Sequence, residues 1–237
     1  MPKPILANQL GGTSGDDTLD RRGYSDNWTI DGRGGNDVLY GGSGEDNLIG
    51  GRGDDLIYAS LEDIAVNGGA GVDTVSFLYS GTGAFVGLDG GAVYVLPYDP
   101  INPPLRYVLS GVENAIGSNY DDHLQGSRAV NHLDGGAGND ILEPRGTGDF
   151  LTGGTGADSF SIQSASKTVT VTDFHYNEGD RLVMDSTPEL SWLDGLSANA
   201  DGNLEQAWIA TCDLQFGGSL TIVILGADTA PSGDWFS

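Results

Sequence analysis

Residues 32–76 divide into five consecutive units of nine residues, which read GRGGNDVLY, GGSGEDNLI, GGRGDDLIY, ASLEDIAVN and GGAGVDTVS. Glycines gather in the first four positions of a unit, and position six is Asp in four of the five units. Position eight is a large apolar residue in every unit. Because composition alone does not hold such a register, we interpret this stretch as an internal structural repeat.

The repeat continues on both sides of this stretch. The units GTSGDDTLD from Gly12 and RRGYSDNWT from Arg21 precede it, and Ile30 and Asp31 are then a two-residue insertion. A second block from Gly117 reads GSNYDDHLQ, GSRAVNHLD, GGAGNDILE, PRGTGDFLT and GGTGADSFS. The chain therefore contains twelve units in two blocks.

Two positions keep their character across the twelve units. Position six is Asp in ten of them, and the exceptions are Ile64 and Asn131. Position eight is apolar throughout, which predicts the core. Its residues are Leu19, Trp28, Leu39, Leu48, Ile57, Val66, Val75, Leu124, Leu133, Leu142, Leu151 and Phe160.

The composition of the 237 residues excludes several classes of function. Lys and Arg total 10 against 34 Asp and Glu, a formal charge of −24. Nucleic acids and anionic membranes require a basic face, so we expect neither as a partner and expect cations instead. The single cysteine, Cys212, excludes a disulfide framework and a CxxC metal or redox site. No apolar run approaches the roughly 18 residues of a transmembrane segment.

The physics of one unit divides at position six. Positions seven to nine form a strand that turns only the side chain of position eight inward, because side chains alternate between the two faces. One buried aliphatic side chain contributes about 2 kcal/mol, whereas ordering nine residues costs on the order of 10 kcal/mol. Another interaction must therefore stabilise the repeat.

The glycine-rich half of the unit supplies oxygen ligands. Glycines allow positive φ angles, so backbone carbonyls can converge. Calcium prefers six to eight oxygens, and two stacked loops that each gave two carbonyls and one Asp carboxylate would provide six. Zinc and copper prefer nitrogen or sulfur, and the chain has only three His and one Cys, so calcium is the expected ion.

The pattern GGxGxDxUx resembles the calcium-binding nonapeptide of RTX proteins over about residues 11–161. The resemblance implies an all-β fold: a parallel β-roll (β-solenoid) of calcium-binding nonapeptide repeats, with two repeats per turn, calcium between adjacent turns and a C-terminal β capping segment. Loop n then faces loop n+2, so that Asp37 pairs with Asp55 and Asp55 with Asp73. Asp46 would meet Ile64, which predicts a weak or empty site there.

The same pairing extends to the other units, and we estimate roughly five to seven ions from it. It predicts Asp17 opposite Asp37, Asp26 opposite Asp46, Asp122 opposite Asp140, Asp140 opposite Asp158, and Asn131 opposite Asp149. The predicted metal-site residues are Asp17, Asp26, Gly35, Asp37, Gly42, Gly44, Asp46, Gly51, Gly53, Asp55, Gly69, Gly71, Asp73, Asp122, Asn131, Gly136, Gly138, Asp140, Asp149, Gly154, Gly156 and Asp158.

The chain divides into four expected segments. Residues 1–76 are the first repeat block with a short N-terminal lead, and residues 77–116 are a β-hairpin insertion and linker, with strands AFVGL and AVYVL joined by Asp89-Gly90-Gly91. Residues 117–161 are the second block. Residues 162–237 are a C-terminal cap and type I secretion signal. Within the cap, DFHYNEGDRLVM from Asp173 resembles the segment after the last repeat of secreted RTX proteins, and a further strand is expected over Ser219 to Leu225.

The aromatic residues of the insertion have two interpretations, a carbohydrate or partner platform and packing of the hairpin on the roll. Packing is the favoured one. These residues are Phe77, Tyr79, Phe85, Tyr94, Tyr98 and Tyr107.

Catalysis is not expected. The chain has no GxSxG, HExxH or P-loop motif, and His123, His132 and His175 have no partner at metal or triad spacing. We therefore predict no catalytic residues and no organic cofactor.

The leading hypothesis for function is an extracellular calcium-binding RTX protein that folds on calcium after export and acts as a structural, adhesive or surface-interaction module. Residues 1–10 have no apolar stretch of a cleaved signal peptide, and the ending Asp234, Trp235, Phe236 and Ser237 resembles a type I secretion signal. We therefore expect secretion by that route.

Two alternatives remain. One is the C-terminal module of a larger secreted enzyme, such as a protease, lipase or polysaccharide epimerase. The other is a polysaccharide-binding module with a basic groove, whose candidate arginines are Arg21, Arg22, Arg33, Arg52, Arg106, Arg128, Arg145 and Arg181.

Overall fold

The computed structural model describes residues 8–95, 105–162, 168–184, 191–198, 204–213 and 219–225. For 94–95, 105–107, 191–198, 204–213 and 219–220 it describes the backbone alone. The expected ending from Asp234 to Ser237 lies outside the described residues, as does the lead before residue 8.

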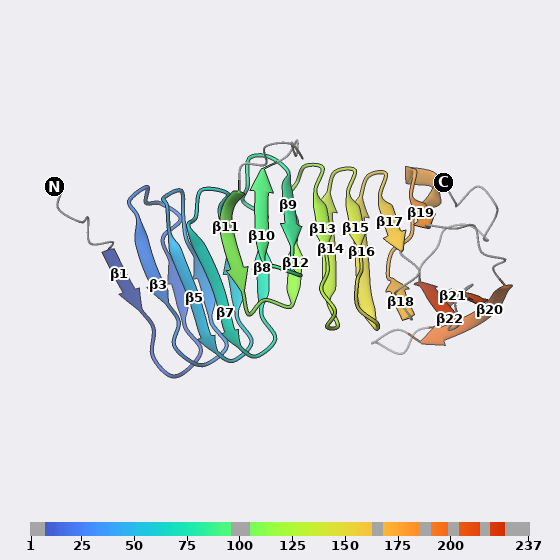
Figure 1. The fold of residues 1–237 in the computed structure, drawn as a ribbon, viewed down its shortest axis with the longest axis horizontal. Coiled ribbons are helices and arrows are strands. Elements are labelled where there is room, and N and C mark those ends of the chain that lie inside the picture. The colour runs from blue at the N-terminus through green and yellow to red at the C-terminus, as the bar shows by residue number, and fades with distance from the viewer. Residues whose placement is uncertain are drawn as a thin grey trace.

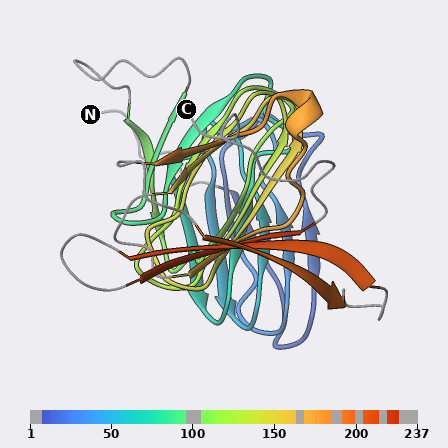
Figure 2. The same cartoon turned by 90° about the vertical axis from the view of Figure 1, so that its right-hand side faces the viewer.

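The described chain forms an elongated roll of two 11-stranded sheets that face each other (Figures 1 and 2). Sheet A has the order β1 (Asn8–Gly11), β3 (Trp28–Asp31), β5 (Asn47–Arg52), β7 (Ala65–Ala70), β11 (Leu105–Ser110), β10 (Ala92–Val95), β9 (Ala84–Gly87), β13 (His123–Gln125), β15 (Ile141–Glu143), β17 (Ser159–Ile162) and β19 (Arg181–Met184). Sheet B has the order β2 (Thr18–Asp20), β4 (Val38–Tyr40), β6 (Leu56–Tyr58), β8 (Thr74–Ser76), β12 (Asn114–Ile116), β14 (His132–Ala137), β16 (Asp149–Thr155), β18 (Thr168–Val171), β22 (Ser219–Leu225), β21 (Leu204–Asp213) and β20 (Ser191–Ala198).

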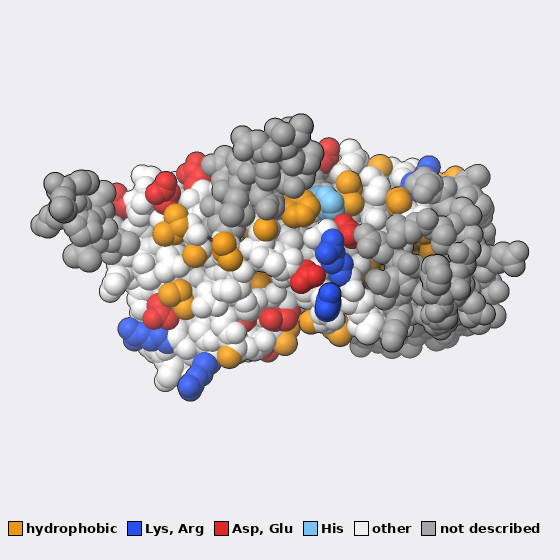
Figure 3. Space-filling model, viewed as in Figure 1, with side chains coloured by type: hydrophobic (Ala, Val, Ile, Leu, Met, Phe, Trp, Pro, Cys, Tyr) orange, Lys and Arg blue, Asp and Glu red, His pale blue; other side chains and the backbone are white. Residues whose placement is uncertain are grey.

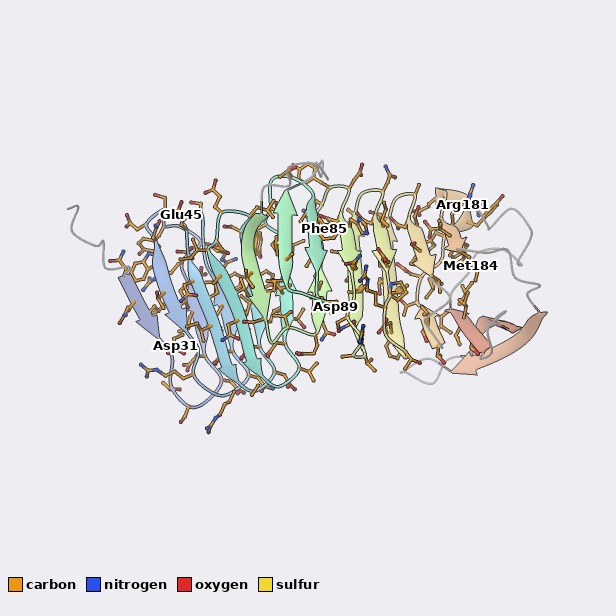
Figure 4. The ribbon with its side chains drawn as sticks, viewed as in Figure 1. Asp31, Glu45, Phe85, Asp89, Arg181 and Met184 are labelled. Atoms are coloured by element: carbon orange, nitrogen blue, oxygen red, sulfur yellow. The ribbon has the colours of Figure 1, made fainter. Side chains whose placement is uncertain are left out.

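Successive units enter the two sheets alternately, so one turn of the roll holds two units. Each strand pairs in parallel with the strand two units on, as Leu39 does with Ile57 and Leu48 with Val66. The predicted all-β parallel β-roll is confirmed. The loops lie along two opposite edges, which Figure 4 marks by Asp31 on one edge and Glu45 on the other. We name them the B-entry edge, whose loops lead into sheet B, and the A-entry edge, whose loops lead into sheet A.

The core is a single file of aliphatic side chains between the sheets, as position eight predicts. Leu39, Leu48, Ile57, Val66 and Val75 are completely buried in the first block. Their counterparts in the second block are Leu124, Leu133, Leu142, Leu151 and Phe160, which are at most 1% exposed.

The prediction for the second unit is wrong in register. Ile30 is completely buried and pairs with Leu48, so Ile30 and not Trp28 holds position eight. The unit is therefore residues 23–31, and the two extra residues are Arg21 and Arg22. A single-file core accepts an aliphatic side chain more readily than an indole. Trp28 is instead half-buried, and the guanidinium carbon of Arg21 lies 4.2 Å from the centroid of its indole ring.

The insertion forms the expected hairpin and joins the two blocks. β9 and β10 pair antiparallel. β11 continues the hairpin and pairs in parallel with β7 of the first block, while β9 pairs in parallel with β13 of the second. In sheet B, β12 follows β8 directly and precedes β14. The two blocks therefore share both sheets and form one continuous roll (Figure 1).

The C-terminal end is covered by additional structure. After β18 comes a short 3-10 helix η1 (Tyr176–Glu178), and Phe174, completely buried, lies 5.9 Å from the ring of Phe160. β22 pairs in parallel with β18, and β21 and β20 follow antiparallel, lying across the end of the roll in Figure 2. Among the described residues, no helix has the length and apolarity to cross a membrane.

The core supports a first prediction. Leu142 is completely buried in β15, whereas its neighbour Ile141 is 41% exposed. We expect Leu142→Ala to lower the free energy of unfolding in calcium by about 2–5 kcal/mol, because it leaves a cavity between the sheets. Ile141→Ala is the control and should change it by no more than about 0.5 kcal/mol. Denaturant unfolding followed by circular dichroism measures both, and equal effects would contradict a single-file core.

Candidate metal centres

All but one of the predicted loop glycines have positive φ angles, a backbone conformation that favours glycine. Gly51 and Gly53 have φ angles of 120° and 110°, and in the next turn Gly69 and Gly71 have 116° and 148°. A Cβ at Gly69 would lie within 2.9 Å of the Gly51 backbone, so the loops stack too closely for any larger residue. The other predicted glycines with positive φ are Gly35, Gly42, Gly136, Gly138, Gly154 and Gly156, while Gly44 is the exception.

Stacked loops are linked by hydrogen bonds from the backbone to the position-six acids. The N–H of Asp37 donates to Oδ1 of Asp55 at 2.8 Å, and the N–H of Asp55 donates to Oδ1 of Asp73 at 2.8 Å. The other predicted pairs brought together in this way are Asp17 with Asp37 (2.7 Å), Asp122 with Asp140 (2.7 Å), Asp140 with Asp158 (2.9 Å) and Asn131 with Asp149 (2.8 Å).

Position five forms a parallel ladder that the sequence analysis missed. The N–H of Asn36 donates to Asp16, and the N–H of Asp54 donates to the amide oxygen of Asn36 at 2.9 Å. The N–H of Val72 then donates to Asp54 at 2.8 Å. These side chains are exposed, so they satisfy loop N–H groups without enclosing an ion.

The second carboxylate oxygen divides the position-six acids into two groups. In the first group, Oδ2 is buried and has no hydrogen-bond partner. This group consists of Asp37, Asp46, Asp55, Asp73, Asp140 and Asp158.

In four of the six acids, Asp37, Asp55, Asp73 and Asp140, the unpartnered oxygen faces a carbonyl oxygen of the next turn across a glycine. A Cβ at Gly50 would lie 2.5 Å from the Gly68 carbonyl oxygen and would also contact Oδ2 of Asp55. Gly135 stands in the same relation to the Gly153 carbonyl oxygen, at 2.7 Å, and to Oδ2 of Asp140. A buried acceptor without a donor is costly, and converging oxygens are the ligands that calcium prefers, so these residues fit the ion.

In the second group, protein donors occupy the same oxygen. Oδ2 of Asp122 accepts from the N–H of Ser118 at 2.6 Å and from its hydroxyl at 2.9 Å. Thr13 does the same for Asp17. These two units have Ser or Thr at position two, where the first group has glycine or, at Arg33, another residue with positive φ.

Two further predicted residues belong with the second group. The side-chain oxygen of Asn131 accepts from the N–H of Ser127 at 2.6 Å. Oδ2 of Asp149 accepts from the N–H of Gly146 at 3.0 Å. All four acceptors of this group are satisfied by the protein itself.

The prediction for Asp26 is not supported by the geometry. Its side chain is exposed, and the N–H of Trp28 donates to Oδ1 of Asp46 at 2.7 Å in the place predicted for it. The reason is the shifted register, which puts Trp28 at position six. Asp26 approaches the next loop only through its backbone, since a Cβ at Gly44 would lie 2.5 Å from the Asp26 carbonyl oxygen.

Asp46 meets Ile64 through the backbone, as predicted, because the N–H of Ile64 donates to the Asp46 carbonyl oxygen at 2.8 Å, but the side chain of Ile64 does not face Asp46. Ile64 is 56% exposed, and Asp63 turns inward beside Asp46 instead. A Cβ at Gly41 would lie 3.2 Å from Oδ2 of Asp46 and 3.4 Å from Oδ1 of Asp63. Oδ2 of Asp63 accepts from the N–H of Ser60 at 2.7 Å. The sequence signal for Asp63 is an acid at position five, one position before the usual position six, in a unit that contains no glycine.

A second missed acid is Glu113. The N–H of Asp73 donates to its Oε2 at 2.9 Å, so Glu113 continues the ladder on the B-entry edge where the repeat is interrupted. The signal in the sequence is that Glu113 precedes the short strand β12, as the position-six acids precede theirs. On the A-entry edge, Asp180 of the segment from Asp173 accepts from the N–H of Asp158 at 2.9 Å and closes the ladder.

Burial raises the pKa values of the unpartnered acids. It raises the pKa of Asp140 to about 7 and the pKa values of Asp158 and Asp73 to about 6, with neighbouring acids adding to the effect. Burial, together with the charge of Asp46, also raises the pKa of Asp63 to about 8. A divalent cation between the turns would favour the ionised carboxylates.

Two of the three histidines lie on the outer faces of the sheets, whereas the backbone N–H of His175 donates to Oδ2 of Asp180 at 2.7 Å. His123 and His132 point outward, as expected. Nε2 of His123 lies 3.4 Å from Oε2 of Glu143, and Figure 3 shows basic and acidic side chains gathered over this face of β13 and β15. Within the described ranges, no group of three or more His, Cys, Asp or Glu side chains could hold a metal ion. Backbone carbonyls would therefore have to supply most ligands for an ion in the loops.

Comparison with known families agrees with this geometry. The model of the RTX calcium-binding nonapeptide repeat matches four copies, over residues 23–60 and 109–143. No curated protein matches the chain. The predicted resemblance is confirmed: the chain carries RTX calcium-binding nonapeptide repeats, and their roll is a structural calcium-binding fold.

The division of the acids gives a second prediction. We expect Asp140→Asn to lower the number of calcium ions bound per chain, because it replaces an unpartnered carboxylate oxygen. Asp122→Asn is the matched control on the same edge, since Ser118 already occupies its Oδ2. It should retain the ion count of the unaltered protein. Equilibrium dialysis with radioactive calcium measures the ratio, and equal losses in the two variants would contradict the division.

The raised pKa values give a third prediction, for the metal-free chain. Raised pKa values of Asp140, Asp158 and Asp73 mean that protonation stabilises the folded state. This contribution is complete below the ordinary value of 3.8 and is lost as pH rises through about 6 to 7. In chelator, the β signal in circular dichroism should therefore increase as pH falls from about 8 to about 5. A signal that is independent of pH in this window would contradict the assignment.

Proposed function

We propose that this chain is an extracellular RTX module that is secreted by a type I system, folds on binding calcium outside the cell and then acts as a structural, adhesive or surface-interaction module. The observation that carries the proposal is the set of six buried Asp Oδ2 atoms without a hydrogen-bond partner. A cation between the turns would satisfy each of them. The acids proposed to hold calcium are Asp37, Asp46, Asp55, Asp73, Asp140 and Asp158, together with carbonyl oxygens of the facing loops.

Five of the six acids are proposed to hold ions on opposite edges in the two halves of the roll, and the sixth, Asp46, lies on the A-entry edge of the first block. Asp37, Asp55 and Asp73 are on the B-entry edge of the first block. Asp140 and Asp158 are on the A-entry edge of the second block, because the insertion between the blocks changes which edge the glycine-rich units occupy. With ions in both blocks, calcium would stabilise both halves of the roll.

The charge of the chain explains why calcium would act as a folding switch. A formal charge of −24 opposes compaction, and the single-file core is too thin to offset backbone ordering alone. Sites with few carboxylates and many neutral carbonyls have dissociation constants on the order of 10⁻⁴–10⁻³ M, so they would be empty in the cytosol and filled outside the cell. At ten times its dissociation constant, each ion contributes about 1.4 kcal/mol.

The alternative of a module in a larger secreted enzyme uses the same calcium chemistry, since the roll would serve that enzyme as a folding and export unit. A polysaccharide-binding role is favoured by a separate feature of the surface, a pocket lined by tyrosines on the outer face of sheet B. Calcium-dependent folding is common to all three hypotheses and is therefore the property to test first.

The fourth prediction is that the roll requires calcium. At neutral pH in chelator, the circular dichroism spectrum should be that of a disordered chain, and millimolar calcium should produce a β spectrum. The transition should be cooperative, because adjacent turns share loops. Magnesium at the same concentration is the control and should fail, because it demands tighter octahedral geometry and loses its waters reluctantly. A complete β spectrum in chelator would refute the switch.

A further inference from the structure

A pocket of about 260 Å³ lies on the outer face of sheet B, where the loops that follow β4 and β6 begin. Three tyrosines and one arginine line it: Tyr40 and Tyr58 end β4 and β6, Tyr79 follows β8, and Arg22 follows β2. Its volume is below the roughly 300–1,000 Å³ of pockets that enclose drug-sized molecules. The pocket therefore suits a single ring with the remainder of the ligand outside.

The tyrosine rings form two walls. Tyr40 and Tyr58 occupy position nine of units one turn apart, so they point outward at the same height and stack with centroids 4.5 Å apart and planes at 2°. The ring of Tyr79 is tilted by 47° to Tyr58, with centroids 5.3 Å apart. Tyr79 was expected to pack the insertion, yet it is 58% exposed, whereas Phe77 is completely buried. An exposed ring held at an angle to a stacked pair leaves an aromatic surface open to solvent.

The arginine is fixed and its charge is compensated. Nε and Nη2 of Arg22 donate to the carboxylate of Asp20, at 3.1 and 2.7 Å. The guanidinium lies 4.1 Å from the centroid of the Tyr40 ring, and Nη1 donates to the Tyr79 hydroxyl at 3.4 Å. Ser43 and Ser60 complete the rim. The pocket thus combines aromatic faces with a rim of hydroxyls and a charge-neutral Arg–Asp pair.

We propose that this pocket binds one pyranose ring of a neutral glycan. A pyranose has an apolar face of C–H groups, which packs on an aromatic ring, and a rim of hydroxyls that donate and accept hydrogen bonds. Tyr79 offers the exposed ring, and Arg22, Asp20 and the tyrosine hydroxyls offer the polar partners. The charge selects a neutral sugar, because Arg22 is already paired and a chain at −24 repels a polyanion.

This inference rests on the proposed function and deepens it. Tyr40 and Tyr58 come together only when successive turns of the roll stack, so the pocket would exist only in the calcium-loaded protein. A glycan would then be the partner of the surface-interaction module.

The experiment is affinity electrophoresis of the full chain in native gels with millimolar calcium. The probes are the soluble neutral polysaccharides galactomannan, xyloglucan and mixed-linkage β-glucan, with alginate as the acidic comparator. We expect retardation by at least one neutral polysaccharide and none by alginate. Circular dichroism of the same samples in calcium reports folding separately, so a failure to fold counts against the proposed function and a failure of the folded protein to bind counts against the pocket.

The variants locate the binding. Tyr79→Ala and Arg22→Gln should each weaken the affinity for the retarding polysaccharide about tenfold, with an unchanged spectrum, because both side chains are exposed. Tyr120→Ala is the matched control, since Tyr120 is 49% exposed and lies outside the pocket. The proposal is overturned if the folded protein binds no neutral polysaccharide, if it binds alginate alone, or if Tyr79→Ala binds as tightly as Tyr120→Ala.

Discussion

The position-six carboxylate connects neighbouring turns of the roll, and the rest of the structure depends on how its two oxygens are used. Oδ1 accepts a backbone N–H from the preceding turn, as in the 2.8 Å contact between Asp37 and Asp55. Oδ2 faces a carbonyl oxygen of the next turn at Asp37, Asp55, Asp73 and Asp140. Successive turns repeat at the spacing of paired strands, roughly 4.7–4.9 Å, so the carboxylates form columns of like charge at each edge. Hydrogen bonds align these columns, and their charge requires either a cation or a shifted pKa.

The chain has two ways to satisfy the second oxygen. Where position two is glycine, Oδ2 stays free for an ion. Where position two is Ser or Thr, that residue closes it off: the N–H and hydroxyl of Ser118 both donate to Oδ2 of Asp122, and the N–H of Ser60 donates to Oδ2 of Asp63. The unit of Ser118 follows the insertion directly, and the units of Ser60 and Ser127 are each separated from it by one unit. Protein donors also act near the insertion through Asn131, whose side-chain amide donates to the Glu113 carbonyl at 2.6 Å. Between them, the unit of residues 68–76 leaves Oδ2 of Asp73 without a partner.

Sequence patterning predicted the features that depend on alternation and spacing. It failed where two candidate residues for one core position fit the same alternation. Trp28 and Ile30 are two residues apart and lie on the same face of a strand, so only the width of the core decides between them. Asp63 was missed because its unit has no glycines and its acid comes one position early. Glu113 was missed because it lies outside the two blocks, and only stacking on Asp73 shows that it belongs to the ladder. The hairpin was predicted correctly because Asp89-Gly90-Gly91 gives a local turn signal.

In this fold the position-six acids lie at the two edges of the roll, and the side chains displayed to solvent lie on the outer faces of the two sheets. The two edges are constrained by glycines with positive φ and by acids that must meet across turns. The outer faces are built from positions seven and nine, whose side chains point away from the core, so their residues are free to differ between units. The same positions carry the stacked pair Tyr40 and Tyr58 on sheet B and the polar group of His123, Gln125 and Glu143 on sheet A. Because parallel pairing places equivalent positions of successive turns side by side, two similar residues one turn apart are enough to make a platform. A fold that is specified at its edges can therefore acquire a binding surface on its faces without altering the metal sites.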